Sequence, residues 1–135
     1  MVDVLVLGQP LSDALDPITG ELLRVGQDLG NEVGVIFVNM PPDHVISKVV
    51  ELGADVVYLT KDQIPQESST DLAVSVLEQV CKETSPSVVV AGVTQTGMEV
   101  APRVAARLGV GAAQGCTRVW TDTETGRLVA RRPVY

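Results

Sequence analysis

The sequence has few of the residues on which enzymes most often rely. Its 135 residues include one histidine and two cysteines. The histidine, His44, follows a Pro-Pro-Asp stretch at an expected helix start, where a surface residue is a better interpretation than a general base. Cys81 and Cys116 lie far apart and match no metal-ligand spacing. We interpret both as small buried hydrophobic residues and expect neither a metal site nor a disulfide.

Long apolar runs are also missing. No run approaches the ~20 residues that a membrane-spanning helix needs. Asp3 follows Met1 and Val2 in a segment that predicts a strand rather than a signal peptide. We therefore expect a cytoplasmic protein without a transmembrane segment. With 45% hydrophobic and 20% charged residues, the chain predicts a single globular domain over residues 1–135.

Three motifs of nucleotide-binding and hydrolytic proteins are absent. The segment after the first apolar run, "GQPLSD" (8–13), lacks the G-x-G-x-x-G of dinucleotide-binding turns. The chain contains no G-x-x-x-x-G-K-[ST] phosphate loop and no G-x-S-x-G nucleophile elbow. An ordinary NAD-binding domain is therefore disfavoured, a P-loop NTPase is excluded, and we predict no catalytic residues and no enzyme.

The distribution of charge narrows the choice of partners. A net charge of −7 disfavours nucleic acid. Residues 1–102 contain 15 acidic and 4 basic residues, whereas residues 103–135 contain 2 acidic and 6 basic residues, all of them arginine. Arginine favours bidentate contacts with carboxylates and phosphates. Two interpretations stay open: scattered ion pairs on a solvated surface, or a C-terminal end that faces an anion or a partner.

Four valine-rich apolar runs recur along the chain with little polar alternation, which is typical of parallel strands buried on both faces. The expected strands are "VDVLVLG" (2–8), "EVGVIFVN" (32–39), "DVVYLT" (55–60) and "SVVVAGV" (87–93). Helical patterns cover residues 17–29, 42–52, 70–84 and about 98–108. Strands that alternate with helices predict right-handed crossovers and an α/β fold with a doubly wound parallel sheet.

The pattern changes after Gly109. Segments 116–121 and 127–135 alternate more clearly between apolar and polar residues, and "DTETG" (122–126) separates them. These features predict a C-terminal antiparallel hairpin, either added at an edge of the sheet or reaching away from the domain.

Open α/β sheets bind ligands at the carboxyl ends of their strands. The candidate loops are Gln9–Asp16, Asn39–Asp43 and Thr94–Met98. Asp13 and Asp16 in the first loop could hold a ligand hydroxyl, although Asp16 followed by Pro17 fits a helix N-cap equally well.

The third loop carries the strongest signal. Its glycines admit a close backbone approach, its threonines supply hydroxyl groups, and the following helix N-terminus favours an anion. The candidate cofactor-binding residues are Gly92, Thr94, Thr96 and Gly97. We expect the regular helix to begin near Met98 or Glu99, with Pro102 in its first turn or at a kink. The alternative is a capped helix packed by its Ala/Val face, with its arginines in solvent.

One family has these features. The stretch "VVVAGVTQTGMEVAPRVAARLGVG" resembles the signature of the N-terminal domain of the electron transfer flavoprotein alpha subunit, A-G-x-T-x-x-G followed by A-P-R-x-A-A-x-L. The matching residues are Ala91, Gly92, Thr94, Gly97, Ala101, Pro102, Arg103, Ala105, Ala106 and Leu108. "LGADVVYLT" (52–60) and "ARRPVY" (130–135) resemble two further segments of that domain, so that the resemblance covers essentially the whole chain.

The resemblance implies a Rossmann-like fold of the adenine-nucleotide alpha-hydrolase type. It also implies a beta-subunit partner and one FAD, which takes electrons from dehydrogenases. In this family the FAD lies mainly in a C-terminal flavin-binding domain that residues 1–135 do not include, so no FAD-binding residue can be assigned. The beta subunit's similar domain can hold AMP. We expect the interface with the beta subunit or the flavin domain to include Arg103, Arg107, Arg131 and Arg132.

Three functions remain to be compared. The first is a scaffold and docking domain of an electron-transfer subunit. The second is a free-standing AMP- or ATP-binding module of the universal-stress-protein type. Those proteins usually have a G-x-x-G-x-G-[ST] segment at this place, and "GVTQTGM" matches that segment only in part. The third is an adenylating or nucleotide-hydrolysing enzyme, which needs a pyrophosphate loop such as S-G-G-x-D-S where this chain has "GQPLSD". The first function agrees best with the residues.

Overall fold

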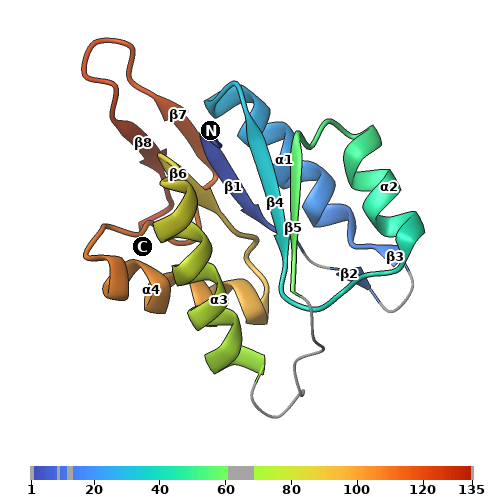
Figure 1. Ribbon diagram of the computed structural model, residues 1–135. Helices are drawn as coiled ribbons and strands as arrows, with labels where there is room; N and C mark the ends of the chain where they lie inside the picture. Colours follow the sequence, from blue (N-terminus) through green and yellow to red (C-terminus); the bar gives the residue numbers. More distant parts are fainter. Residues whose placement is uncertain (1, 9, 12–13, 61–68, 135) are drawn as a thin grey trace.

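A four-stranded parallel sheet forms the centre of the molecule. The computed structural model describes residues 2–8, 10–11, 14–60 and 69–134 (Figure 1). The strands lie in the order β5-β4-β1-β6, and each neighbouring pair is parallel. Their bounds are Val4–Leu7 for β1, Val33–Phe37 for β4, Val56–Leu59 for β5 and Val88–Val90 for β6. All four predicted strands are confirmed, each shorter than its apolar run.

Two helices cover each face of this sheet (Figure 1). Helices α1 and α2 pack on one face, and α3 and α4 pack on the other. Their bounds are Pro17–Leu29 for α1, Asp43–Glu51 for α2, Ser69–Thr84 for α3 and Gln95–Leu108 for α4. The predicted doubly wound α/β fold is therefore confirmed. The loop at residues 61–68 lies outside the described residues.

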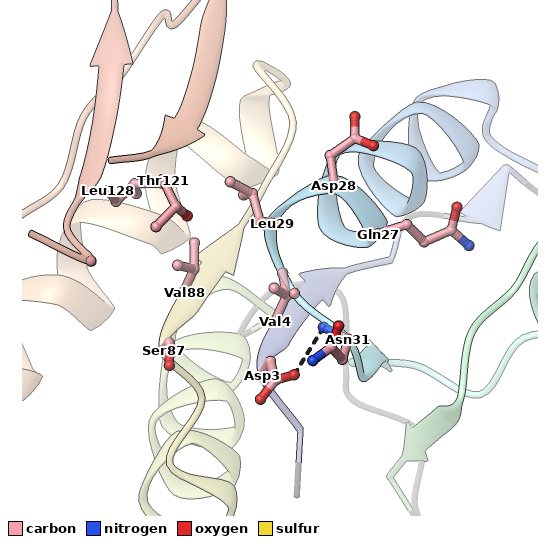
Figure 2. A pocket seen from close by; sticks show the side chains of 12 residues that line it. Asp3, Val4, Gln27, Asp28, Leu29, Asn31, Ser87, Val88, Thr121 and Leu128 are labelled. Carbon is pink, nitrogen blue, oxygen red and sulfur yellow. Dashed lines mark hydrogen bonds between the residues drawn. The ribbon is translucent and has the colours of Figure 1, made fainter. Parts of the chain in front are cut away.

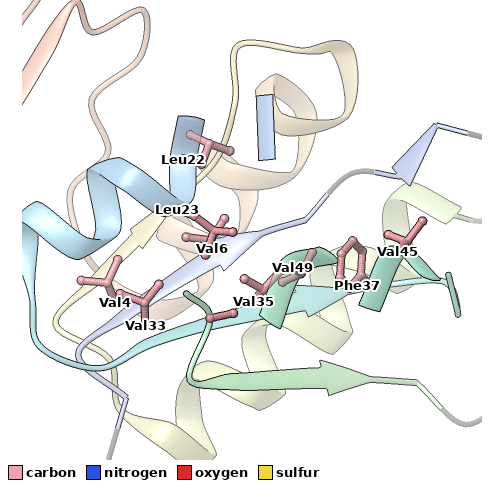
Figure 3. Close-up of a cluster of buried hydrophobic side chains, with 10 residues drawn as sticks. Val4, Val6, Leu22, Leu23, Val33, Val35, Phe37, Val45 and Val49 are labelled. Carbon is pink, nitrogen blue, oxygen red and sulfur yellow. The ribbon is translucent and has the colours of Figure 1, made fainter. Parts of the chain in front are cut away.

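The sheet separates two hydrophobic cores because alternate residues of a strand point to opposite faces. Val4 and Val6 of β1 pack under α1 and α2, together with Phe37 of β4 (Figure 3). Leu5 and Leu7 of the same strand pack under α3 and α4. The central strands β1 and β4 are fully buried, as expected for parallel strands covered on both faces.

Two short antiparallel pairs lie outside the parallel sheet. The C-terminal pair joins β7 (Arg118–Thr121) to β8 (Leu128–Arg131), which confirms the predicted hairpin. It forms a separate two-stranded sheet, and β7 contacts α1. The second pair, β2 (Pro10–Leu11) and β3 (Ala14–Leu15), lies in the segment predicted as a loop after the first strand.

The carboxylate of Asp3 connects the amino-terminal ends of two neighbouring strands of the sheet. Its Oδ2 accepts hydrogen bonds from the backbone N–H groups of Asn31 and Glu32, at 2.9 and 3.0 Å. These residues immediately precede β4, so the carboxylate joins the start of β1 to the start of its neighbour. Asp55 has a similar role before β5, because its Oδ2 accepts a hydrogen bond from Val33 N at 2.8 Å.

Removing the Asp3 carboxylate is expected to destabilise the domain. Hydrogen bonds to a charged group contribute about 1.5–3 kcal/mol each, and Asp3 is only partly buried, so Asp3→Ala should lower the free energy of unfolding by about 1–3 kcal/mol. Urea denaturation at neutral pH measures this change. Glu21→Ala on α1 removes an exposed carboxylate and is the control, with an expected change below about 0.5 kcal/mol. Equal stability of the two variants would contradict the anchoring role.

Candidate functional site

The loop after β6 lies at the switch point of the sheet. The chain runs from β1 outward through β4 to β5, and then returns to place β6 on the other side of β1. The carboxyl ends of β1 and β6 therefore flank the crevice where open α/β sheets bind ligands. Gly8 follows β1 there, and residues 91–94 lead from β6 into α4.

In this loop, Thr94 is the N-cap residue of α4. Its Oγ1 accepts a hydrogen bond from Gly97 N at 3.0 Å, and its carbonyl accepts one from Met98 N at 2.8 Å. The N–H of Gly97, one of the helix-terminal groups that could otherwise face an anion, is thus used inside the protein, whereas the Met98 N–H makes the first regular bond of the helix. A phosphate at this helix terminus would have to compete with the contact to Gly97.

The expected start of this helix near Met98 or Glu99 is wrong, because α4 begins at Gln95. Thr94 has extended backbone angles and a capping side chain, which allows Thr96 and Gly97 to form the first helical turn. Pro102 consequently lies in the helix interior rather than in the first turn. It has no N–H to donate to the carbonyl of Met98, so one bond of the helical ladder is missing.

The two glycines of the loop are required by packing inside the chain. A Cβ atom on Gly97 would overlap the carbonyl oxygen of Gly92. A Cβ atom on Gly92 would lie 2.7 Å from Cδ1 of Ile18, at the start of α1. Both glycines are buried. They bring α4, β6 and α1 together, and this internal contact accounts for the absent side chains without a ligand.

These contacts predict weak nucleotide binding. We expect isothermal titration of the chain with AMP, ATP and FAD to show no binding near micromolar affinity, about −8 kcal/mol. The reason is that the helix terminus is capped by Thr94 and the glycines contact protein rather than open space. Micromolar binding of AMP or ATP without binding of FAD would contradict this expectation and favour the nucleotide-binding module.

The two arginines of α4 contact α3. Arg103 Nη2 lies 2.6 Å from Oδ1 of Asp71, and Arg107 Nη1 lies 3.1 Å from Oε2 of Glu78. Lys82 also pairs with Glu78, at 3.0 Å. Hydrogen bonds from Lys82 and Arg107 hold the pKa of Glu78 below its usual value. The charges of both α4 arginines are therefore balanced within the chain, and their role at a partner interface stays a prediction.

The other two predicted interface arginines belong to the C-terminal hairpin and the residue that follows it. Arg131 ends β8, and Arg132 comes next; both are exposed. Trp120 of β7 lies near Arg131, whose guanidinium carbon is 5.8 Å from the ring centroid. Arg118 lies closer to the same ring, at 4.9 Å. Sequence reasoning included Arg118 only as one of the C-terminal arginines and did not select Trp120, because the hairpin register brings these side chains together.

The remaining candidates are one histidine, two cysteines and two aspartates. His44 is exposed in the first turn of α2. Both cysteines are free thiols, and burial raises the pKa of Cys81. Among the described residues, no group of three His, Cys, Asp or Glu side chains could hold a metal ion, and no helix is long and apolar enough to cross a membrane. Asp13 lies outside the described residues, and Asp16 is the N-cap of α1, with Oδ1 3.1 Å from Ile18 N.

A cleft of 440 Å³ lies at the amino-terminal ends of the strands, at the end of the sheet opposite to the switch-point loop (Figure 2). It lies between the end of α1, the starts of β1 and β6, and the hairpin. Thr121 and Leu128 of the hairpin line one side, and Asp28 and Asn31 line the other. Sequence reasoning missed this cleft, because it exists only when the hairpin folds beside the amino ends of the strands.

The fold defines a Rossmann-like α/β domain. The family profile of the electron transfer flavoprotein domain matches residues 4–135, and the chain belongs to that family.

Two curated relatives agree with this assignment. The chain is 29% identical over 118 residues to Protein FixB of Clostridium saccharobutylicum, covering 87% of this chain and 35% of that protein. It is 29% identical over 136 aligned residues to the electron transfer flavoprotein subunit alpha of Clostridium acetobutylicum, covering 98% of this chain and 40% of that protein. The chain thus spans well under half of either relative. These similarities agree with the resemblance to an N-terminal alpha-subunit domain.

Proposed function

We propose that this chain is the N-terminal scaffold and docking domain of an electron transfer flavoprotein alpha subunit. In this role it supports FAD-mediated electron transfer from dehydrogenases, together with a beta subunit in the cytoplasm. The observation that carries the proposal is the family match over residues 4–135, with similarity to a relative named as an alpha subunit. Residues 1–135 form one domain in this proposal.

The geometry of the switch point supports a scaffold rather than a cofactor site. Flavin and adenine nucleotides carry phosphates, and the helix terminus that would receive them is capped by Thr94. Gly92 and Gly97 leave no open cradle, since each faces protein atoms. We therefore place the FAD mainly outside this chain, and the chain's contribution is to hold its partners in position. The family consists of electron carriers, which agrees with a domain that performs no reaction itself.

Complex formation with a beta subunit tests this function. The purified chain and an electron transfer flavoprotein beta subunit are mixed, with and without FAD, and analysed by size-exclusion chromatography with light scattering. We expect a complex with one copy of each. Separate elution under both conditions, at concentrations of tens of micromolar, would contradict the docking role. The beta subunit with an unrelated α/β domain of similar charge is the control.

A further inference from the structure

Unmatched positive charge gathers on one face of the hairpin. Arg118 and Arg131 are direct cross-strand partners in the register of β7 and β8. Both guanidinium groups approach the ring of Trp120, at 4.9 and 5.8 Å from its centroid. Trp120 follows Arg118 by two residues, so both side chains lie on the same face of the strand. We call these three residues the hairpin platform.

The platform arginines differ in their pairing from four other cations of the domain. Lys48, Lys82, Arg103 and Arg107 each lie in an ion pair with a carboxylate of the same chain. In the part of the chain that the structure describes, neither platform arginine has such a carboxylate. Like charges directly opposite each other destabilise a hairpin, and the cation–π contacts offset only part of that repulsion. A carboxylate from another molecule would complete the arrangement.

The opposite face of the hairpin is turned toward the domain. Thr121 and Leu128 form a cross-strand pair, and both line the cleft beside the end of α1 (Figure 2). Side chains alternate along a strand, so the face that carries Arg118, Trp120 and Arg131 is directed away from this cleft. The hairpin extends beside the parallel sheet (Figure 1), which makes this outer face accessible to a partner.

We propose that the hairpin platform docks a carboxylate-bearing surface of the beta subunit. This inference rests on the proposed function. It assigns the contact to arginines of the hairpin rather than to the arginines of α4. Arginine forms bidentate hydrogen bonds with carboxylates, and arginine and tryptophan are the residues that most often dominate binding energy at interfaces. An acidic protein surface is favoured over nucleic acid, because residues 1–102, with a net charge of −11, would repel a long polyanion.

The single tryptophan of the chain gives a direct readout of this surface. The chain is labelled with 5-fluorotryptophan, so that only Trp120 contributes to its fluorine NMR spectrum, and it is titrated with unlabelled beta subunit. We expect the resonance to shift on binding, and we expect the affinity to fall as the salt concentration rises.

Charge-removing variants locate the contact. Arg118→Gln with Arg131→Gln should weaken binding about tenfold or more and reduce its salt dependence. Lys48→Gln with Lys82→Gln removes the same net charge from the body of the domain and should leave the affinity within about twofold. Arg118→Lys with Arg131→Lys keeps the charge but loses the planar fork, and should weaken binding to an intermediate degree. In each free variant, a Trp120 resonance that differs from that of the same variant in denaturing urea shows that the hairpin is still folded.

The outcomes separate this inference from the proposed function. If the unmodified chain does not bind the beta subunit, the proposed function fails, and the inference fails with it. If it binds while the Trp120 resonance stays fixed and the Gln double variant binds normally, the function stands and the hairpin platform is overturned. Loss of binding only in Arg103→Gln with Arg107→Gln would likewise overturn it, in favour of α4. A Trp120 shift produced equally by inorganic phosphate at low millimolar concentration would show a general anion site instead.

Discussion

Replacing Phe37 by alanine is expected to lower the free energy of unfolding by about 3–5 kcal/mol. Phe37 is the only phenylalanine of the chain and is completely buried at the end of β4. It belongs to the core between the sheet and α2, with Val45 and Val49 (Figure 3). Its removal costs the transfer free energy of the ring and leaves a cavity that the strand backbone cannot close.

Urea denaturation followed by far-ultraviolet circular dichroism measures this loss. Domains of this size have a total stability of about 5–15 kcal/mol, so Phe37→Ala should shift the midpoint strongly and populate unfolded molecules at moderate denaturant. Val110→Ala removes an apolar side chain that is 59% exposed and should change stability by less than about 0.5 kcal/mol. If Phe37→Ala lowers the free energy of unfolding as little as Val110→Ala does, the ring is not part of the core.

A double-mutant cycle with Gly8 tests the contact itself. A Cβ atom on Gly8 would lie 2.6 Å from Cε1 of Phe37, so Gly8→Ala alone should cost about 1–3 kcal/mol through overpacking. In the Phe37→Ala background the added methyl group enters the space that the ring has left. We therefore expect the double variant to be more stable than the sum of the two single losses, by about 0.5–3 kcal/mol. Strict additivity would mean that the two residues do not touch.

Local sequence signals predicted the regular elements well, because each element depends on its own residues. Asp16 before Pro17 predicted the start of α1, and the structure shows that cap with its hydrogen bond. The valine-rich runs predicted the parallel strands, but those runs are longer than the strands. The run over residues 87–93, for example, contains a strand only at Val88–Val90, because β6 pairs only with Val4–Val6 of β1.

Contacts between distant elements could not be predicted from the same signals. Arg103 was selected for its charge, but its partner Asp71 lies 32 residues away on α3. That contact exists because α3 and α4 pack side by side on one face of the sheet. The convergence of Arg118 and Arg131 likewise depends on the hairpin register. The charge asymmetry of the sequence indicated the whole C-terminal part as a candidate interface. Only the fold distinguishes arginines that pair with a carboxylate of the chain from arginines that do not.

The switch-point loop shows why one sequence signal can have two meanings. Glycine is required where a backbone meets a ligand, and it is also required where two elements of the same chain meet. Both cases give the pattern "AGVTQTG" (91–97), so the sequence alone left a nucleotide loop and a capped helix as alternatives. The atoms next to each missing Cβ distinguish the two cases. For Gly92 and Gly97 those atoms belong to the protein.

Gly97→Ala is therefore expected to destabilise the domain by about 2–3 kcal/mol. Two effects oppose each other at this position. Alanine in a helix is favoured over glycine by about 1 kcal/mol, which would stabilise α4. Against this gain, the new Cβ overlaps the carbonyl oxygen of Gly92, a backbone atom that cannot rotate away. Gly92 is itself held against Ile18, so α4 must move away from β6 and lose part of the contact of Val100 and Val104 with the second core.

The same substitution at Gly111 is the matched control, because a Cβ there would meet nothing within 4 Å. Gly111→Ala should be neutral or stabilise the domain by about 0.4–1 kcal/mol, through the reduced freedom of the unfolded chain. Urea denaturation of both variants, with titration of AMP and ATP, decides between the two roles of the loop. A Gly97→Ala variant that is as stable as Gly111→Ala would contradict the packing role. Suppose instead that the unmodified chain binds AMP or ATP, and that Gly97→Ala loses this affinity without losing stability. Gly97 would then face the nucleotide, because the missing Cβ would make room for the ligand rather than for protein atoms.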